Sequence, residues 1–152
     1  MKANHTSVLV IEPHPLMREA LCTTIALEPD LCLLKPSAMD PNAFPLIIPS
    51  HDDVLFLAGK PDLVLLSLGN PGLEDLKTLA DLRKKLPDTY ILALTPGELP
   101  GQNQTALEYG AHAVITKSVS QKELLETLRS IHMHSQVTSN KMKSNRSINQ
   151  KG

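Results

Sequence analysis

The sequence predicts a doubly wound α/β domain whose sheet has five parallel strands. Short runs rich in Val, Ile and Leu alternate with longer segments of helical period, which is the pattern of repeated βαβ units. The short runs are apolar throughout, as expected for strands that helices cover on both faces. With 152 residues, of which 41% are hydrophobic, the chain has room for about one such domain.

The first three elements lie between residues 7 and 35. Ser7–Ile11 (SVLVI) and Leu31–Lys35 (LCLLK) are short apolar runs, and we predict them as strands. Pro15–Glu28 carries apolar residues three and four apart, which predicts a helix between these strands. Pro15 stands in the first turn of this helix, where the missing N–H of proline costs no hydrogen bond.

Residues 36–59 give the weakest pattern. Pro36–Ser50 has prolines at positions 36, 41, 45 and 49, which predicts an irregular loop. Asp52–Gly59 is the only candidate for a helix between the second and third strands. In that case Asp52 or Asp53 would serve as its N-cap, because a carboxylate there accepts bonds from the first-turn N–H groups.

The middle of the chain predicts two further strands around an amphipathic helix. Leu63–Leu66 (LVLL) and Tyr90–Leu94 (YILAL) are apolar runs of strand length. Between them, Leu73–Leu86 has leucines on one side and charged residues mostly on the other. This arrangement predicts a surface helix whose apolar side packs on the sheet.

The last elements are two helices and the fifth strand. We predict them at Gln104–Tyr109, Ala113–Thr116 and Ser120–His134. The short helix ends at Gly110, because glycine adopts the left-handed conformation of a helix C-cap at little cost. The final helix begins with Ser120 and Glu123 at the spacing of a capping box.

Charge is distributed unevenly along the chain. The 15 Lys and Arg residues against 16 Asp and Glu residues give a formal net charge of −1, so the chain lacks the strong basic excess of nucleic-acid-binding domains. All the acidic residues precede residue 135, whereas residues 135–152 carry four basic residues and few apolar ones. We therefore expect three parts: a disordered N-terminus over residues 1–6, a folded domain over 7–134, and a disordered basic tail over 135–152.

Neither the cysteines nor the apolar runs indicate export. No run reaches the roughly 18 residues that span a bilayer, and the polar start of the chain is unlike a secretion signal. Cys22 and Cys32 lie in apolar segments, where we expect small core residues with reduced thiols rather than a disulfide framework. These observations favour a cytoplasmic location without membrane contact.

Polar residues follow four of the predicted strands. In a doubly wound sheet, ligands bind outside the carboxyl ends of the strands. The residues at these ends are Glu12 and Pro13, Ser67 and Gly69, Thr95, and Lys117. An acid, two hydroxyls and a lysine would converge there as a candidate pocket, although loops also favour short polar residues at strand ends.

Four stretches of sequence resemble the receiver domain of two-component response regulators. They are VLVIEPHPLMREAL, PDLVLLSLGNPGLEDL, LRKKLPDTYILALT and GAHAVITKSVSQKELLETL. The resemblance is greatest to receivers that precede a LuxR-type helix-turn-helix, and it covers Ser7–His134 with a departure in Pro36–Ser50. It implies the flavodoxin-like receiver fold with strand order 2-1-3-4-5.

The resemblance also implies roles for the pocket residues. In this family an aspartate accepts a phosphoryl group with help from a divalent ion, which two acids hold at the end of the first strand. By position, Ser67 stands at the phosphoacceptor, Glu12 and Pro13 at the acid pair, Gly69 at the metal-binding carbonyl, Thr95 at the switch hydroxyl and Lys117 at the phosphate-contacting lysine. Thr95 and Lys117 match the family, whereas the acceptor, the acid pair and Gly69 depart from it. Val114 also replaces the aromatic partner of the switch hydroxyl.

These departures predict a pocket without phosphoryl chemistry. A serine hydroxyl cannot form the acyl phosphate that an aspartate forms, and no histidine is placed beside Ser67 to act as a base. Glu12 alone would bind Mg²⁺ too weakly, because Pro13 offers no side-chain oxygen. We therefore expect no enzyme activity, cofactor or metal, and we expect Lys117 to pair with Glu12 instead.

The resulting interpretation is a stand-alone pseudo-receiver that acts in signalling or transcription regulation by binding a protein. The resemblance places the partner surface on the fourth helix, fifth strand and fifth helix, for a signalling or transcription regulator or for a second copy of the chain. Its residues here are Glu108, Tyr109, His112, Lys122, Glu126 and Arg129. Two alternatives stay open: a degenerate receiver regulated by modification of Ser67 or by a small ligand, and a remnant of a LuxR-type factor that lost its DNA-binding domain. We expect no direct contact with nucleic acid.

Overall fold

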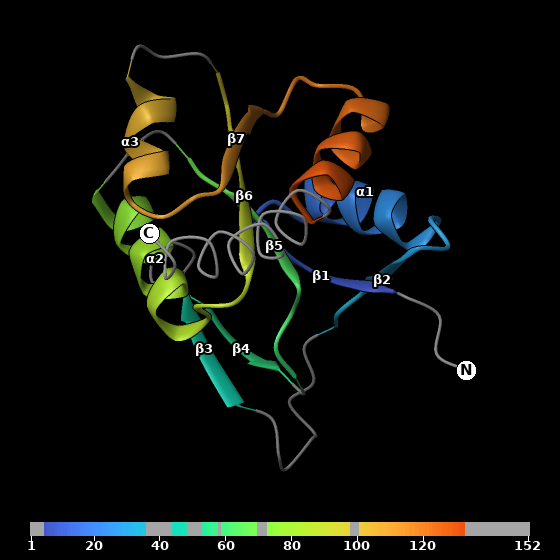
Figure 1. The fold of residues 1–152 in the computed structure, drawn as a ribbon, viewed down its shortest axis with the longest axis horizontal. Helices are drawn as coiled ribbons and strands as arrows, with labels where there is room; N and C mark the ends of the chain where they lie inside the picture. The colour runs from blue at the N-terminus through green and yellow to red at the C-terminus, as the bar shows by residue number, and fades with distance from the viewer. Residues whose placement is uncertain are drawn as a thin grey trace, which may run out of the picture.

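The main sheet of the protein has five parallel strands, which confirms the predicted fold class. The computed structural model describes residues 5–35, 44–48, 53–57, 59–69, 73–97 and 101–132. The strands are β1 (Thr6–Ile11), β2 (Leu31–Leu33), β5 (Leu63–Ser67), β6 (Tyr90–Thr95) and β7 (Ala113–Thr116). Their order across the sheet is β2-β1-β5-β6-β7 (Figure 1). Counted along the chain within this sheet, that is the predicted order 2-1-3-4-5.

Helices cover both faces of the sheet. They are α1 (Pro15–Ala26), α2 (Leu73–Lys85), α3 (Gln102–Glu108) and a C-terminal helix over residues 121–132, the orange helix beside α1 in Figure 1. α1 and the C-terminal helix bury Leu21, Ile25, Leu124 and Leu128 against one face. α2 and α3 cover the other face, where they pack against the alternate residues of each strand. In β1, for example, Leu9 points to this face, whereas Val8 and Val10 point to the first. Alternate residues of each strand therefore enter two separate cores.

Local sequence signals set the ends of these helices. Pro15 occupies the first turn of α1, as predicted. At the start of the C-terminal helix, the Ser120 hydroxyl accepts a hydrogen bond from the backbone N–H of Glu123 at 3.1 Å, which is the N-cap half of the predicted capping box. Gly110 follows α3 with φ 125°, a conformation that glycine adopts without steric cost.

The predictions for residues 44–48 and 53–57 were wrong, and residues 36–43, 49–52 and 58 lie outside the described residues. The chain forms two strands there, β3 (Phe44–Ile48) in the predicted loop and β4 (Asp53–Leu57) in the predicted helix, and they pair antiparallel. Asp53 therefore begins a strand and caps no helix, while Asp52 lies outside the described residues. Leu46 and Leu57 are buried in the core beside α2, whereas Pro45 and Phe56 are exposed. This alternation is the period of a strand with one covered face.

Smaller differences occur elsewhere. α1 ends at Ala26 rather than at residue 28, and β2 ends at Leu33 rather than at residue 35. Cys22 is half-buried, but Cys32 is exposed, so the prediction that both are core residues was wrong for Cys32. It is the middle residue of the short edge strand β2, and the strand alternation turns it away from the core that holds Leu31. The expected tail over 135–152 lies outside the described residues. In the part of the chain that the structure describes, no helix is long and apolar enough to cross a membrane.

Candidate functional site

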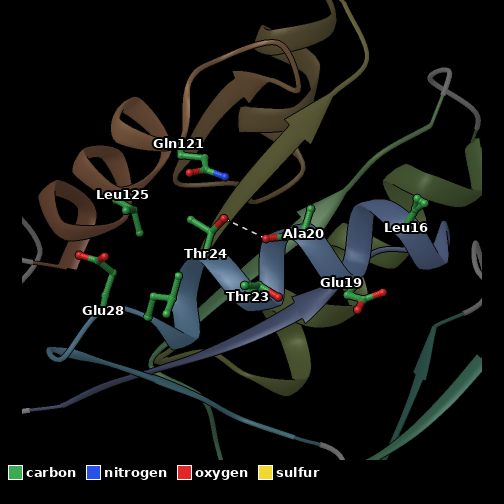
Figure 2. A pocket seen from close by; sticks show the side chains of 9 residues that line it. Leu16, Glu19, Ala20, Thr23, Thr24, Glu28, Gln121 and Leu125 are labelled. Atoms are coloured by element: carbon green, nitrogen blue, oxygen red, sulfur yellow. Dashed lines mark hydrogen bonds between the residues drawn. The ribbon is translucent and has the colours of Figure 1, made fainter.

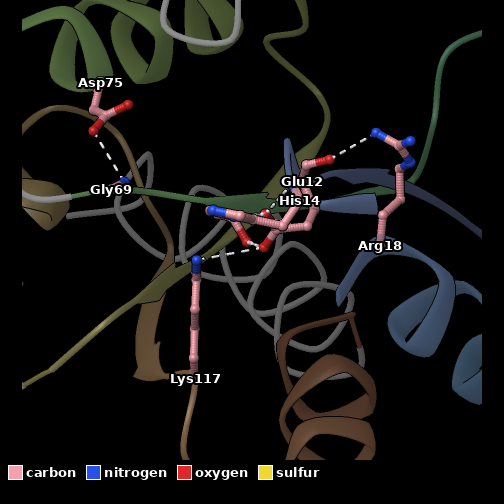
Figure 3. Close-up of polar contacts among 7 residues, drawn as sticks. Glu12, His14, Arg18, Gly69, Asp75 and Lys117 are labelled. Atoms are coloured by element: carbon pink, nitrogen blue, oxygen red, sulfur yellow. Dashed lines mark hydrogen bonds and ion pairs between the residues drawn. The ribbon is translucent and has the colours of Figure 1, made fainter. Parts of the chain in front are cut away.

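The carboxyl ends of β1, β5 and β7 bring three predicted site residues together. Ile11 in β1 is level with Leu66 in β5, so the next residues, Glu12 and Ser67, lie side by side. Lys117 follows β7, and its side chain reaches back across the sheet edge to the same place (Figure 3). We call Glu12, Ser67, Lys117 and the neighbouring His14 the strand-end cluster.

Glu12 is the centre of this cluster. Its carboxylate is fully buried (0% exposed), and Lys117 is 19% exposed with its Nζ 3.4 Å from Glu12 Oε1. Ser67 donates its hydroxyl proton to the same oxygen. The other oxygen, Oε2, accepts the backbone N–H of His14 at 2.9 Å and lies 3.1 Å from His14 Nδ1 (Figure 3). The predicted pairing of Lys117 with Glu12 is therefore confirmed.

Glu12 is held in its charged form by these contacts. Burial acts to raise the pKa of its carboxyl, because a low-dielectric environment disfavours charge. The hydrogen bonds from Ser67 and His14 and the charge of Lys117 outweigh burial, so the pKa lies below its ordinary value. The cluster therefore consists of a buried carboxylate whose charge the protein itself compensates.

Ser67 lies beside a carboxylate. We expected no histidine next to it, and its hydroxyl donates a hydrogen bond to Glu12 instead. A carboxylate that accepts a hydroxyl proton is the arrangement of a general base next to a nucleophile. Ser67 is only 2% exposed, however, so in this conformation its hydroxyl is enclosed by the protein.

The remaining pocket residues lie around the cluster. Pro13 is exposed. The backbone N–H of Gly69 donates to Asp75 Oδ2 at 3.0 Å, so the first turn of α2 fixes the chain after β5. Thr95 is buried, and its Oγ1 lies 3.4 Å from the Gly97 carbonyl oxygen and 3.5 Å from that of Ile115, which are long distances for hydrogen bonds.

Two residues of the site were not predicted from the sequence. His14 supplies two contacts to Glu12, and Arg18 Nη1 donates to the Glu12 carbonyl oxygen at 3.1 Å. His14 is the N-cap residue of α1, and Arg18 lies in the first turn of that helix. The sequence signal for both is the segment EPHPLMR, in which Pro15 marks the start of the helix. Pro15 begins α1 directly after His14. The chain turns before this helix, and the backbone N–H of His14 then points back to the Glu12 carboxylate.

The donor set does not fit Mg²⁺. This ion prefers octahedral oxygen coordination, usually with one or two carboxylates, waters and phosphate. The oxygens of Glu12 already accept hydrogen bonds from Ser67 and His14 and form an ion pair with Lys117. Pro13 has no side-chain oxygen. Across the described ranges, no group of three or more His, Cys, Asp or Glu side chains could hold a metal ion.

The expected partner surface is partly engaged in internal contacts. Glu108, Tyr109, Lys122 and Glu126 are exposed on α3 and the C-terminal helix. The side chain of Arg129 binds Asp30 through two bonds of 2.8 Å and also binds Glu28, so it joins the C-terminal helix to the start of β2.

His112 is exposed as well, but its ring also makes contacts within the fold. Its Nδ1 accepts the backbone N–H of Ile91 at 3.0 Å, and its ring meets Tyr90 edge-on at 4.7 Å. Burial and the charge of Arg83 lower the pKa of its imidazole, which favours the neutral form that this acceptor role requires. Arg129 and His112 therefore stabilise the domain, whatever they contribute to partner binding.

Comparison with known proteins identifies the family. The response regulator receiver domain family matches residues 8–129. The nitrate/nitrite response regulator NarL of Escherichia coli K12 is 29% identical over 122 residues, which are 80% of this chain and 52% of the relative. The chain thus spans about half the length of that relative.

Solved structures show the same fold. A DNA-binding response regulator of the LuxR family from Staphylococcus aureus is 26% identical with a TM-score of 0.60, over 84% of this chain and 98% of that one. A response regulator from Thermotoga maritima has a TM-score of 0.65 at 18% identity, over 85% and 98% of the two chains. With its sheet order and the family match over residues 8–129, the chain belongs to the receiver domain family of two-component response regulators.

Proposed function

We propose that this receiver domain works without aspartyl phosphorylation and acts by binding a protein partner. The observation that carries the proposal is the pairing of Glu12 with both Ser67 and Lys117 at the ends of three strands. By the family resemblance, Ser67 occupies the position of the phosphoacceptor. The lysine that would contact a phosphoryl group is instead bound to a carboxylate of the protein itself.

The chemistry of these residues supports the proposal. Phosphoryl transfer onto a receiver needs a carboxylate nucleophile and a divalent ion that neutralises the approaching charges. Ser67 offers a hydroxyl, and Glu12 is the single acid at the end of β1. A phosphoryl group would also have to displace Lys117 from Glu12 in order to use its charge.

The exposed residues of α3 and the C-terminal helix support contact as the mode of action. Glu108 and Glu126 are acidic, Lys122 is basic, and Tyr109 offers an aromatic ring that is 40% exposed. Aromatic anchors among mixed charges are typical of protein interfaces. We propose this surface as the site for a different protein, such as a signalling or transcription regulator, and we expect the contact to weaken with salt.

In a second candidate function, the hydroxyl of Ser67 accepts a phosphoryl group. The Glu12 carboxylate that accepts its hydroxyl proton would activate it toward a phosphoryl donor. The burial of Ser67 opposes this function, because the cluster would have to open before any donor could approach.

The test is to incubate the full chain with Mg²⁺ and acetyl phosphate and to measure its intact mass. The matched control is the double variant Pro13→Asp, Ser67→Asp, which restores an acid pair and an acceptor carboxylate. We expect a phosphate adduct on the control and none on the wild type. An adduct on the wild type that maps to Ser67 would support the second candidate, and one on any other residue of the domain would contradict both.

A further inference from the structure

A small cavity lies between α1, β6 and the segment that leads from β7 into the C-terminal helix. Its volume is about 170 Å³. Most of its wall is apolar and comes from Met17, Leu21, Leu94, Val119 and Leu124. Three of these side chains, the leucines, are buried in the core on the α1 side of the sheet. The cavity is therefore a recess in the packed interior of the domain.

The volume of the cavity limits its occupant to a small molecule. A cavity of about 150 Å³ with apolar walls stays dry and binds benzene, whereas sites for drug-sized ligands have about 300–1,000 Å³. A volume of about 170 Å³ therefore fits a single ring with one small substituent.

An open groove between α1 and the C-terminal helix adjoins the cavity. The groove has a volume of about 440 Å³, and Ala20, Thr24 and Gln121 line both the groove and the cavity. Figure 2 shows these residues from the groove, with Gln121 of the C-terminal helix across from Ala20 and Thr24 of α1. The Thr24 hydroxyl donates its proton to the Ala20 carbonyl oxygen at 2.9 Å, within α1. The groove therefore gives a ligand a path to the cavity.

Lys117 lines the cavity but not the groove. Among the described residues around the cavity, it is the one that carries a charge. Its ammonium group has three N–H donors. In the described part of the chain, the acceptor that it contacts is Glu12, with Nζ 3.4 Å from Oε1. Donors of Lys117 therefore remain for an oxygen atom of a ligand.

The charges at Lys117 favour a neutral ligand. Glu12 already compensates the charge of the ammonium group, and its own side chain is fully buried. A carboxylate or phosphate in the cavity would add a second negative charge next to this pair, and an unpaired charge in a low-dielectric site is costly. A neutral hydroxyl oxygen accepts a hydrogen bond from Lys117 without that cost.

We propose that this cavity binds a small neutral molecule with one apolar ring and one oxygen acceptor. The ring lies among Leu21, Leu94 and Leu124, and the oxygen accepts a hydrogen bond from Lys117. The proposal does not rest on the proposed function, because binding requires neither a lack of phosphorylation nor a protein partner. Since Lys117 also pairs with Glu12, an occupant acts directly on the strand-end cluster.

Titration of the full chain with phenol, followed by amide and methyl NMR, tests the site. We expect saturable shifts centred on Leu94, Val119 and Leu124 with a dissociation constant of about 1 mM, because a ligand of so few atoms gains limited binding energy. Val119→Phe fills the cavity and should weaken binding at least about tenfold. Ala20→Met is a second filling variant, at an exposed residue of α1. Thermal melts check that both variants fold.

The matched control is Leu16→Ser. Leu16 lines the groove but not the cavity, and it is 73% exposed, so this change leaves the fold intact. Phenol bound in the cavity should be unaffected by it, whereas phenol bound in the groove would be lost.

Toluene and benzoate test the role of Lys117. Toluene has the size of phenol without the oxygen, and benzoate carries a charge. The wild type should bind phenol at least as tightly as toluene, and benzoate about tenfold more weakly than phenol. In Lys117→Met the phenol hydroxyl has no donor to replace the water that it loses, so toluene should bind about tenfold more tightly than phenol.

Five results would each overturn the proposal. They are the absence of saturable binding, shifts centred on Leu16 rather than on Leu94, phenol binding that both filling variants leave intact, benzoate that binds as tightly as phenol, and a Lys117→Met variant with the preference of the wild type.

Discussion

Glu12 and Lys117 form an ion pair of 3.4 Å that joins the ends of β1 and β7. The two residues come from opposite ends of the domain sequence, and Ser67 of the intervening strand β5 donates to the same carboxylate oxygen. One buried carboxylate thus links three of the five parallel strands at the edge where receivers carry out their chemistry.

Removal of either partner should destabilise the domain. Glu12→Gln and Lys117→Met should each lower the free energy of unfolding by about 1–3 kcal/mol, the cost of leaving a buried polar group without its partner. Lys122→Met is the matched control, because Lys122 is exposed. Urea unfolding measures all three variants. Unchanged stability in both cluster variants would show that the pair contributes nothing.

The Glu12 carboxylate should also make stability depend on pH. Its pKa in the folded protein is lower than the ordinary value near 4.5, so folding favours the charged form. This contribution is present above the ordinary pKa and is lost as the pH falls through the lowered one. The stability difference between wild type and Glu12→Gln should therefore shrink as the pH falls below about 4.5. A difference that stays constant from pH 7 to pH 3 would contradict the assigned charge state.

Arg129 should contribute a salt-dependent part of the stability. It binds Asp30 through two 2.8 Å bonds, but the side chains are 35% and 47% exposed, so solvent screens the pair. Arg129→Met should cost about 1 kcal/mol at low ionic strength and less at 1 M salt. Unfolding at both salt concentrations measures it. An equal cost at the two concentrations would indicate that the loss comes from packing.

The stability of the antiparallel pair β3–β4 should depend on the side chain of Leu57. This side chain is fully buried in the core beside α2, and Leu57→Ala should cost about 2–5 kcal/mol. Its neighbour Phe56 is exposed, so Phe56→Ala should cost much less. Similar losses for the two variants would contradict the strand alternation.

Particular residues show why sequence predicts some of this structure and misses other parts. The five parallel strands are predictable because burial on both faces requires continuous apolar runs, as in Leu63–Ser67. β3 is hidden because prolines flank it and Pro45 lies within it, and proline within a run normally argues against a strand. Pro45 is tolerated in this two-stranded sheet, where each strand has one unpaired edge.

Part of the candidate site could likewise be predicted from the sequence, and part of it could not. Glu12, Ser67 and Lys117 were predicted together because the ends of parallel strands meet at one edge. His14 and Arg18 were missed because their contacts involve backbone groups, the His14 N–H and the Glu12 carbonyl, whose directions depend on the turn after β1. Arg129 was assigned to a partner surface because the proximity of the C-terminal helix to Asp30 has no signature in the sequence.

The most direct test of phosphorylation-independent action is the amide NMR spectrum of the full chain before and after addition of Mg²⁺ and acetyl phosphate. The account predicts that the resonances of Ser67, Lys117 and their neighbours stay unchanged, while those of the Pro13→Asp, Ser67→Asp variant shift. Shifts in the wild type at the strand-end cluster that persist as long as the phosphodonor is present would contradict it.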